Sequence, residues 1–90
     1  MSTDLSSLHK ILKDETRRRI ISQIAEKGSL GYSDLVGIVG SSSTGTLNYH
    51  LKILGDLLEK NEAGQYMLTE KGSVASRLLG VSRTRLLVAG

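Results

Sequence analysis

Residues 44–52, TGTLNYHLK, combine hydroxyl, amide, phenol and ammonium side chains and contain no carboxylate. Leucines in and just after this stretch recur at the spacing of one helix face, namely Leu47, Leu51 and Leu54. At about 100° per residue, small and polar residues fall on the opposite face. That exposed face would carry Gly45, Asn48, Tyr49 and Lys52. Surface helices ordinarily mix both signs of charge, so the missing carboxylates need an explanation.

Contact with the grooves of duplex DNA would explain this composition. Asn48 can pair with adenine through two hydrogen bonds, and Thr44 and Thr46 can offer hydroxyls or a methyl group to base edges. Gly45 would let the backbone approach closely, and a cation is tolerated beside phosphates where carboxylates are not. The alternative is that the face has this composition by chance. The residues of this segment predicted to bind DNA are Ser43 (also the expected helix cap), Thr44, Gly45, Thr46, Asn48, Tyr49 and Lys52.

Two more cations are candidates for phosphate contacts. The run Arg17–Arg19 spreads over about 200° of a helix, so its three side chains cannot face one surface. Arg18 is predicted to reach a phosphate, with a solvated face as the alternative. Arg17 is expected to lie along the core edge and pair with an acid such as Asp34. Lys60, the single cation of the predicted hairpin loop, is the second candidate.

Catalytic and metal chemistry find little support. Ser7 and Lys10 match the pattern S-x-x-K, but its companion motifs are missing, as are glycine-rich phosphate loops and paired carboxylates. His50 flanks the leucine face and is predicted to be a structural hydrogen-bonding residue, while His9 belongs to another helix. Because the sequence has no cysteine, disulfides and thiolate metal sites are excluded. We expect no enzyme activity, no metal and no cofactor, and the sequence points to no effector pocket.

The composition predicts one small domain with an aliphatic core, since only 3% of its 90 residues are aromatic and 39% are hydrophobic. The net charge of +3 is compatible with nucleic-acid binding but only weakly diagnostic. No apolar run approaches the ~18 residues of a membrane span, and the N-terminus lacks the apolar region of a signal peptide. We therefore expect a cytoplasmic protein with no membrane partner.

Apolar spacing and glycine, serine and asparagine punctuation predict the elements that position these residues. The expected order is a helix at 5–12 capped by Thr3 or Asp4, a helix from Asp14 to Gly28, a short strand at 29–31, a helix from Ser33 to Gly40, the helix at 43–55, hairpin strands at 57–60 and 65–68, and a helix from Thr69 to Gly80. This order, helix-helix-(short strand)-helix-turn-helix-hairpin-helix, is mainly α with a small β-hairpin and describes a winged helix-turn-helix. Residues 1–80 would form this domain, and residues 81–90 a tail, a helix extension or an artificial chain end.

Three segments together resemble the ArsR-like winged-helix transcriptional regulators, particularly archaeal members. They are DETRRRII (14–21), LNYHLKIL (47–54) and GDLLEK…GQYMLTEKG (55–72), and the resemblance covers roughly residues 4–80. It implies a homodimer whose recognition helix, about 44–55, enters the DNA major groove while the wing, about 60–65, touches the flanking backbone. The segment SDLVGIVG lacks the cysteine-containing motif of the metal-sensing members, so thiolate sensing is excluded. Tyr49 stands where the family often has Arg or Lys, which implies fewer ionic contacts.

The resemblance also places the dimer interface on the first and last helices. These helices carry more apolar surface than a small domain needs, which a partner would cover. The predicted interface residues are Leu5, Leu8, Leu12, Leu78, Leu79 and Val81.

The sequence thus predicts sequence-specific double-stranded DNA binding by a homodimeric transcriptional regulator. The alternative is a winged-helix protein–protein interaction module of transcription or assembly machinery, which the weak wing charge favours. Binding of RNA or single strands would need an exposed aromatic platform that the sequence does not provide. Salt-sensitive binding to a mixed-sequence duplex would separate the first two hypotheses.

Overall fold

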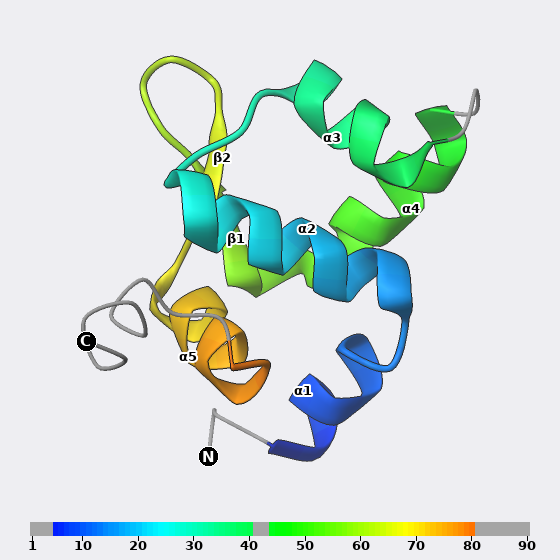
Figure 1. Ribbon diagram of the computed structural model, residues 1–90, viewed down its shortest axis with the longest axis vertical. Coiled ribbons are helices and arrows are strands. Elements are labelled where there is room, and N and C mark those ends of the chain that lie inside the picture. Colours follow the sequence, from blue (N-terminus) through cyan, green and yellow to red (C-terminus); the bar gives the residue numbers. More distant parts are fainter. Residues whose placement is uncertain (1–4, 41–43, 81–90) are drawn as a thin grey trace, which may run out of the picture.

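The computed structural model describes residues 5–40 and 44–80, and over these residues the protein is mainly helical with a small antiparallel hairpin (Figure 1). The elements are α1 (Leu5–Ile11), α2 (Glu15–Lys27), α3 (Tyr32–Val39), α4 (Thr44–Leu54), a 3₁₀ turn η1 (Gly55–Leu57), β1 (Leu58–Lys60), β2 (Tyr66–Leu68) and α5 (Glu70–Leu78). This confirms the predicted fold class and the order of its elements. The expected caps at Thr3, Asp4 and Ser43 and the expected tail at 81–90 lie outside the described residues.

Helix α2 runs through the middle of the molecule, between the hairpin, α3, α4 and α5 (Figure 1). Asp14 begins it as predicted, because its carboxylate accepts hydrogen bonds from the backbone N–H groups of Thr16 at 2.8 Å and Arg17 at 3.2 Å. Gly28 ends the helix with a φ of 93°, a conformation that glycine adopts without a steric cost. The local sequence therefore sets both ends of the central helix.

The core is aliphatic, as the low aromatic content predicts. Its buried residues are Leu8, Leu12, Ile20, Ile21, Ile24, Leu30, Leu35, Leu47, Leu54, Leu57 and Ala75. Each fully buried leucine or isoleucine side chain stabilises the fold by about 1.5–3 kcal/mol relative to its exposed state. The leucines of α4 belong to this set, so the core fixes which side of α4 faces solvent.

The hairpin pairs Leu58 with Leu68 and Lys60 with Tyr66. Its loop is closed by Asn61, whose side-chain oxygen accepts hydrogen bonds from the backbone N–H groups of Ala63 and Gln65, both at 2.9 Å. Leu30 joins the hairpin through reciprocal backbone hydrogen bonds with Tyr66, at 3.0 and 2.8 Å. The short strand predicted at 29–31 is thus a single bridge.

The predicted starts of the third helix and of the first hairpin strand are wrong. The third helix begins at Tyr32 with Gly31 as its N-cap, not at Ser33. The carboxylate of Asp34 accepts a hydrogen bond from the Gly31 backbone N–H at 3.0 Å, and this contact fixes the earlier start. The first hairpin strand begins at Leu58, because Leu57 is only 2% exposed and packs into the core from the 3₁₀ turn.

Candidate nucleic-acid interface

Helix α4 presents an apolar face to the core and a polar face to solvent. Leu47 and Leu54 are 1% and 0% exposed, and Leu51 is half-buried against the same core. The opposite face consists of exposed residues, all of them sequence-predicted: Gly45, Thr46, Asn48, Tyr49 and Lys52. We call these five residues the α4 face. Ser43 and the side chain of Thr44 lie outside the described part of the chain.

A hydrogen bond joins the α4 face to the preceding helix. The hydroxyl of Tyr32, the first residue of α3, donates to Oδ1 of Asn48 at 2.8 Å. Both side chains are exposed. Sequence reasoning missed Tyr32 because it placed the start of α3 at Ser33 and left the tyrosine in a loop. Had the helix been predicted to begin at residue 32, Tyr32 would have been placed on it.

His50 lies under the α4 face and holds it against α2. The ring is only 7% exposed, and Nδ1 lies 3.2 Å from Nη1 of Arg17. Since a guanidinium can only donate, the ring accepts this hydrogen bond. The structural role predicted for His50 is therefore confirmed. The pairing of Arg17 with Asp34 is wrong, because α2 directs the guanidinium toward His50 and Ile11.

The ring of Tyr49 packs edge-on against the ring of His50, with centroids 5.4 Å apart. Tyr49 nevertheless remains 59% exposed. An aromatic side chain on the solvent side of α4 is thus supported from below by a buried ring, which favours a defined orientation over free rotation.

Asp14, the N-cap of α2, is influenced by Arg17 and His50, and the pKa of its carboxyl group is shifted. Burial acts to raise the pKa of Asp14, but the backbone hydrogen bonds from Arg17 and Thr16 and the electrostatic effects of His50 and Arg17 lower it below the ordinary value of 3.8. Asp14 therefore stays ionised at neutral pH and balances part of the positive charge behind α4.

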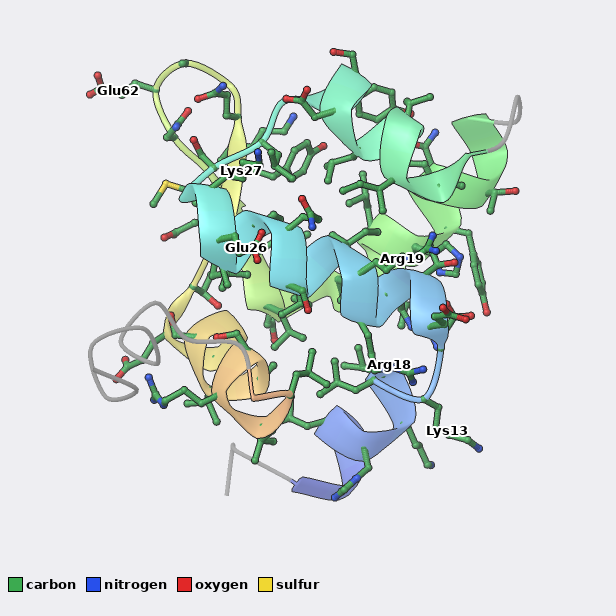
Figure 2. All side chains as sticks on the ribbon, in the orientation of Figure 1. Lys13, Arg18, Arg19, Glu26, Lys27 and Glu62 are labelled. Atoms are coloured by element: carbon green, nitrogen blue, oxygen red, sulfur yellow. The ribbon has the colours of Figure 1, made fainter. Side chains whose placement is uncertain are left out.

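Arg18 does not extend the α4 face. Its Nη1 donates hydrogen bonds to the carbonyl oxygens of Leu12 and Lys13, both at 2.8 Å, and Figure 2 shows the side chain beside the turn between α1 and α2. These two carbonyls belong to the turn that follows α1, which ends at Ile11, and Arg18 supplies their hydrogen-bond donor. Arg18 therefore stabilises the turn between α1 and α2, and its predicted phosphate contact stays a prediction.

Lys60 lies on the hairpin, apart from α4. Its Nζ is 5.2 Å from the centroid of the Tyr66 ring, so the exposed ammonium rests on an aromatic face. Figure 2 shows Glu62 at the far end of the hairpin loop, directed away from the body of the protein. The wing therefore offers one cation at its base and one carboxylate at its tip.

The predicted dimer residues fall into different environments. Leu8 and Leu12 are 5% and 8% exposed within the single chain, so its own core covers them, and their assignment to an interface is corrected. Leu79 is partly buried against the same core, whereas Leu78 is 52% exposed. The side chain of Leu5 and all of Val81 lie outside the described residues.

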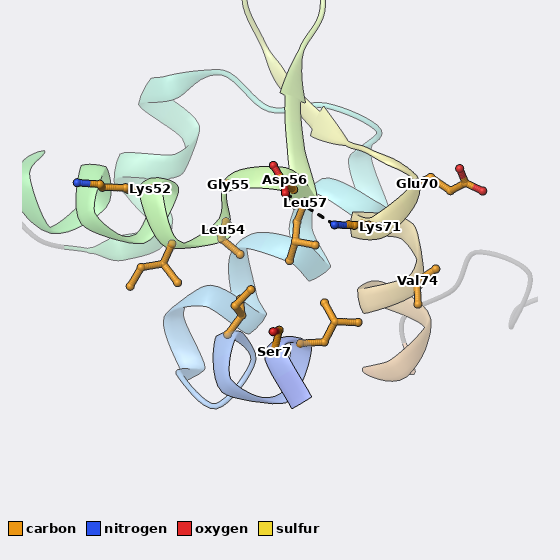
Figure 3. A pocket seen from close by; sticks show the side chains of 12 residues that line it. Ser7, Lys52, Leu54, Gly55, Asp56, Leu57, Glu70, Lys71 and Val74 are labelled. Atoms are coloured by element: carbon orange, nitrogen blue, oxygen red, sulfur yellow. Dashed lines mark ion pairs between the residues drawn. The ribbon is translucent and has the colours of Figure 1, made fainter. Parts of the chain in front are cut away.

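An open groove of about 680 Å³ lies between α1, the end of α4 with η1, and α5 (Figure 3). Its lining includes the apolar side chains of Ile11, Ile53 and Val74, and an ion pair of 3.7 Å joins Lys71 to Asp56 at its edge. Lys52 of the α4 face is also one of the lining residues, and Figure 3 shows its ammonium group extending away from the centre of the groove. Over residues 5–40 and 44–80, no group of three or more His, Cys, Asp or Glu residues is arranged to hold a metal ion. In the same ranges, no helix has the length and apolar character needed to cross a membrane.

A family model described as "Domain of unknown function (DUF7347)" matches residues 6–79. The match spans every helix and strand described above from the second residue of α1 to the end of α5. No curated protein and no solved structure matches the chain.

Proposed function

We propose that this chain, which belongs to the DUF7347 family, binds double-stranded DNA sequence-specifically as a homodimeric transcriptional regulator, in the manner of the ArsR-like proteins it resembles. In this proposal α4 enters the major groove and the wing, residues 60–65, lies on the flanking backbone. The observation that carries the proposal is the α4 face, which is exposed and contains no carboxylate. Such a regulator would act in the cytoplasm.

The dimensions of α4 fit the groove. Its 11 residues span about 16 Å at ~1.5 Å per residue, and the major groove of B-DNA, about 12 Å wide, admits one helix. The amide of Asn48 can bond to a base edge and the hydroxyl of Thr46 to a base or phosphate. In this proposal Lys52, in the last turn of α4, contacts a phosphate.

The charges predict modest dependence on salt. Lys52 and Lys60 are the exposed cations of α4 and the hairpin, and Glu62 opposes phosphate at the wing tip. Each neutralised phosphate contributes about 0.9 to the slope of log K against log salt concentration. Discrimination between duplex sequences would then come largely from base contacts by the α4 face.

Dimerisation is supported by Leu78, which is 52% exposed near the end of α5. A two-fold dimer would place two recognition helices about 34–36 Å apart, in successive major grooves. Analytical ultracentrifugation at micromolar concentration should show a dimer of the 9.7 kDa chain, and Leu78→Glu should shift it toward monomer. Arg77→Glu, a charge change at the exposed neighbouring position, is the matched control and should remain dimeric. A wild-type chain that sediments only as monomer would refute this part of the proposal.

Selection of bound sites from a random duplex pool tests the DNA-binding proposal directly. An enriched sequence is expected, and Asn48→Ala should weaken binding to it by about 1–3 kcal/mol while leaving binding to unrelated duplexes nearly unchanged. If the wild-type protein binds no duplex even at low salt, the proposal is wrong. The protein–protein interaction module would then be the better explanation, and the carboxylate of Glu62 at the wing tip favours that second candidate.

A further inference from the structure

We infer that Tyr32 is a specificity-determining positioning residue, which orients the Asn48 amide for reading one base pair. The inference rests on the proposed function and deepens it, since it identifies the class of base pair that the α4 face would prefer. It starts from the 2.8 Å hydrogen bond between the Tyr32 hydroxyl and Asn48 Oδ1.

The location of this bond argues against a purely structural purpose. Tyr32 is 38% exposed and Asn48 is exposed, so water could serve either group if the other were absent. No buried polar group depends on the contact, and a neutral hydrogen bond in such a place adds little to stability. The contact instead connects the first residue of α3 to the middle of the exposed side of α4, where an amide would meet a base.

The orientation of an asparagine amide matters only when both of its ends are used. The amide carries an acceptor oxygen and an NH₂ donor, which are similar in shape and opposite in hydrogen bonding. The Tyr32 hydroxyl donates to the oxygen, which assigns the two ends. The NH₂ group, with no partner in the described part of the chain, and the second lone pair of Oδ1 remain for DNA.

Adenine has the matching pattern in the major groove. Its N7 accepts and its N6 amino group donates, so a fixed amide can satisfy both atoms at once. Guanine offers two acceptors at the corresponding edge, and one of them would face the amide oxygen. Tyr32 therefore biases the α4 face toward an A·T pair at the position that Asn48 reads. Without the hydroxyl, the amide can turn over and this bias weakens.

A double-mutant cycle on duplex binding tests this inference. The first probe is the best duplex selected from a random pool. Asn48→Ala identifies the position that Asn48 reads, as the position at which this variant no longer distinguishes the base pairs. The other three probes are duplexes that carry each of the remaining base pairs at that position. Tyr32→Phe should reduce the preference for A·T about two- to tenfold, the effect of one net hydrogen bond, without changing the salt dependence of binding. In an Asn48→Ala background the same substitution should have no effect on base preference. Tyr66→Phe removes a phenolic hydroxyl from the hairpin and serves as the matched control, with the preference unchanged.

The outcomes separate this inference from the proposed function. Duplex binding by wild type with an unchanged base preference in Tyr32→Phe would overturn the role of Tyr32 and leave the DNA-binding proposal standing. A loss of base preference from Tyr32→Phe that persists in the Asn48→Ala background would show that Tyr32 touches DNA itself, and the positioning role would be wrong. Nuclear magnetic resonance of the free protein gives a measurement independent of DNA. The side-chain NH₂ of Asn48 should be ordered in wild type and more mobile in Tyr32→Phe, and equal mobility in the two proteins would refute the inference.

Discussion

Nη1 of Arg17 lies 3.2 Å from Nδ1 of His50, and this contact fastens α2 to the buried side of α4. The Nε of the same guanidinium donates to the carbonyl oxygen of Ile11, the last residue of α1, at 2.7 Å. One side chain therefore links three helices. Because His50 is only 7% exposed, the position of α4 depends on a polar contact as well as on its leucines.

Arg17→Ala should lower the free energy of unfolding by about 1–3 kcal/mol, because it leaves the partly buried Ile11 carbonyl and the buried His50 ring nitrogen without their donor. Urea denaturation monitored by circular dichroism measures the change. Arg19→Ala is the matched control, since Arg19 lies on the same helix and is exposed, and it should stay within about 0.5 kcal/mol of wild type. Equal stabilities of the two variants would mean that the Arg17 contacts contribute nothing.

Asp14 should make the stability of the protein depend on acid pH. Its pKa in the folded protein lies below the ordinary value of 3.8, so its ionised form stabilises the fold. That contribution is complete above the unfolded pKa and is lost as the pH falls through the lower folded pKa. Urea denaturation from pH 6 down to the acid range should therefore show a decline to which Asp14 contributes.

Asp14→Asn isolates that contribution, because asparagine caps helices about as well as aspartate and does not titrate in this range. The difference in unfolding free energy between wild type and Asp14→Asn should shrink as the pH is lowered. A difference that stays constant with pH would refute the assignment. Asp14→Ala, which removes the cap itself, should cost about 1 kcal/mol at neutral pH.

The elements that depend on local chemistry could be predicted from the sequence. Asp14 and Thr69 mark the starts of α2 and α5 in the sequence because an N-cap acts within three residues of itself, and Thr69 accepts a hydrogen bond from the Gly72 backbone N–H at 3.2 Å. The exposed side of α4 followed from the spacing of its leucines. The start of α3 was harder, because Ser33 offers a hydroxyl that suits a cap, whereas Gly31 offers only its backbone and relies on Asp34.

Contacts between distant residues could not be predicted in the same way. Tyr32 and Asn48 are 16 residues apart, and Arg17 and His50 are 33 apart. Whether such pairs meet depends on how the helices cross, which residue spacing within one helix does not encode. The same limit explains Leu8, because an apolar residue on a terminal helix can cover its own core or a partner, and only the packed structure distinguishes the two.

Lys52→Ala should weaken binding to every duplex and reduce the magnitude of the salt slope by about 0.9, if its ammonium contacts one phosphate. Fluorescence anisotropy at several salt concentrations measures both quantities. Lys10→Ala removes the same charge from α1, outside the α4 face and the wing, and should leave the slope unchanged. A Lys52→Ala slope equal to that of wild type would remove this residue from the proposed interface.

Alanine substitutions at two helical glycines, Gly72 and Gly37, should change the free energy of unfolding in opposite directions. A Cβ at Gly72, in the first turn of α5, would overlap the carbonyl oxygen of Leu57 and lie 3.0 Å from the Cβ of Leu68. Gly72→Ala would force α5 away from η1 and β2, so the free energy of unfolding should fall by about 1–3 kcal/mol. Thermal unfolding should show the loss, at about 4–8 °C of melting temperature for each kcal/mol.

Gly37 provides the opposite case, since it is exposed within α3 and a Cβ there would meet nothing within 4 Å. Gly37→Ala should stabilise the protein by up to about 1 kcal/mol, because alanine loses less conformational entropy in a helix. If Gly72→Ala melts at the same temperature as wild type, α5 does not pack against the Leu57 carbonyl. A destabilising Gly37→Ala would show instead that this side of α3 is covered, which its exposure in the single chain does not predict.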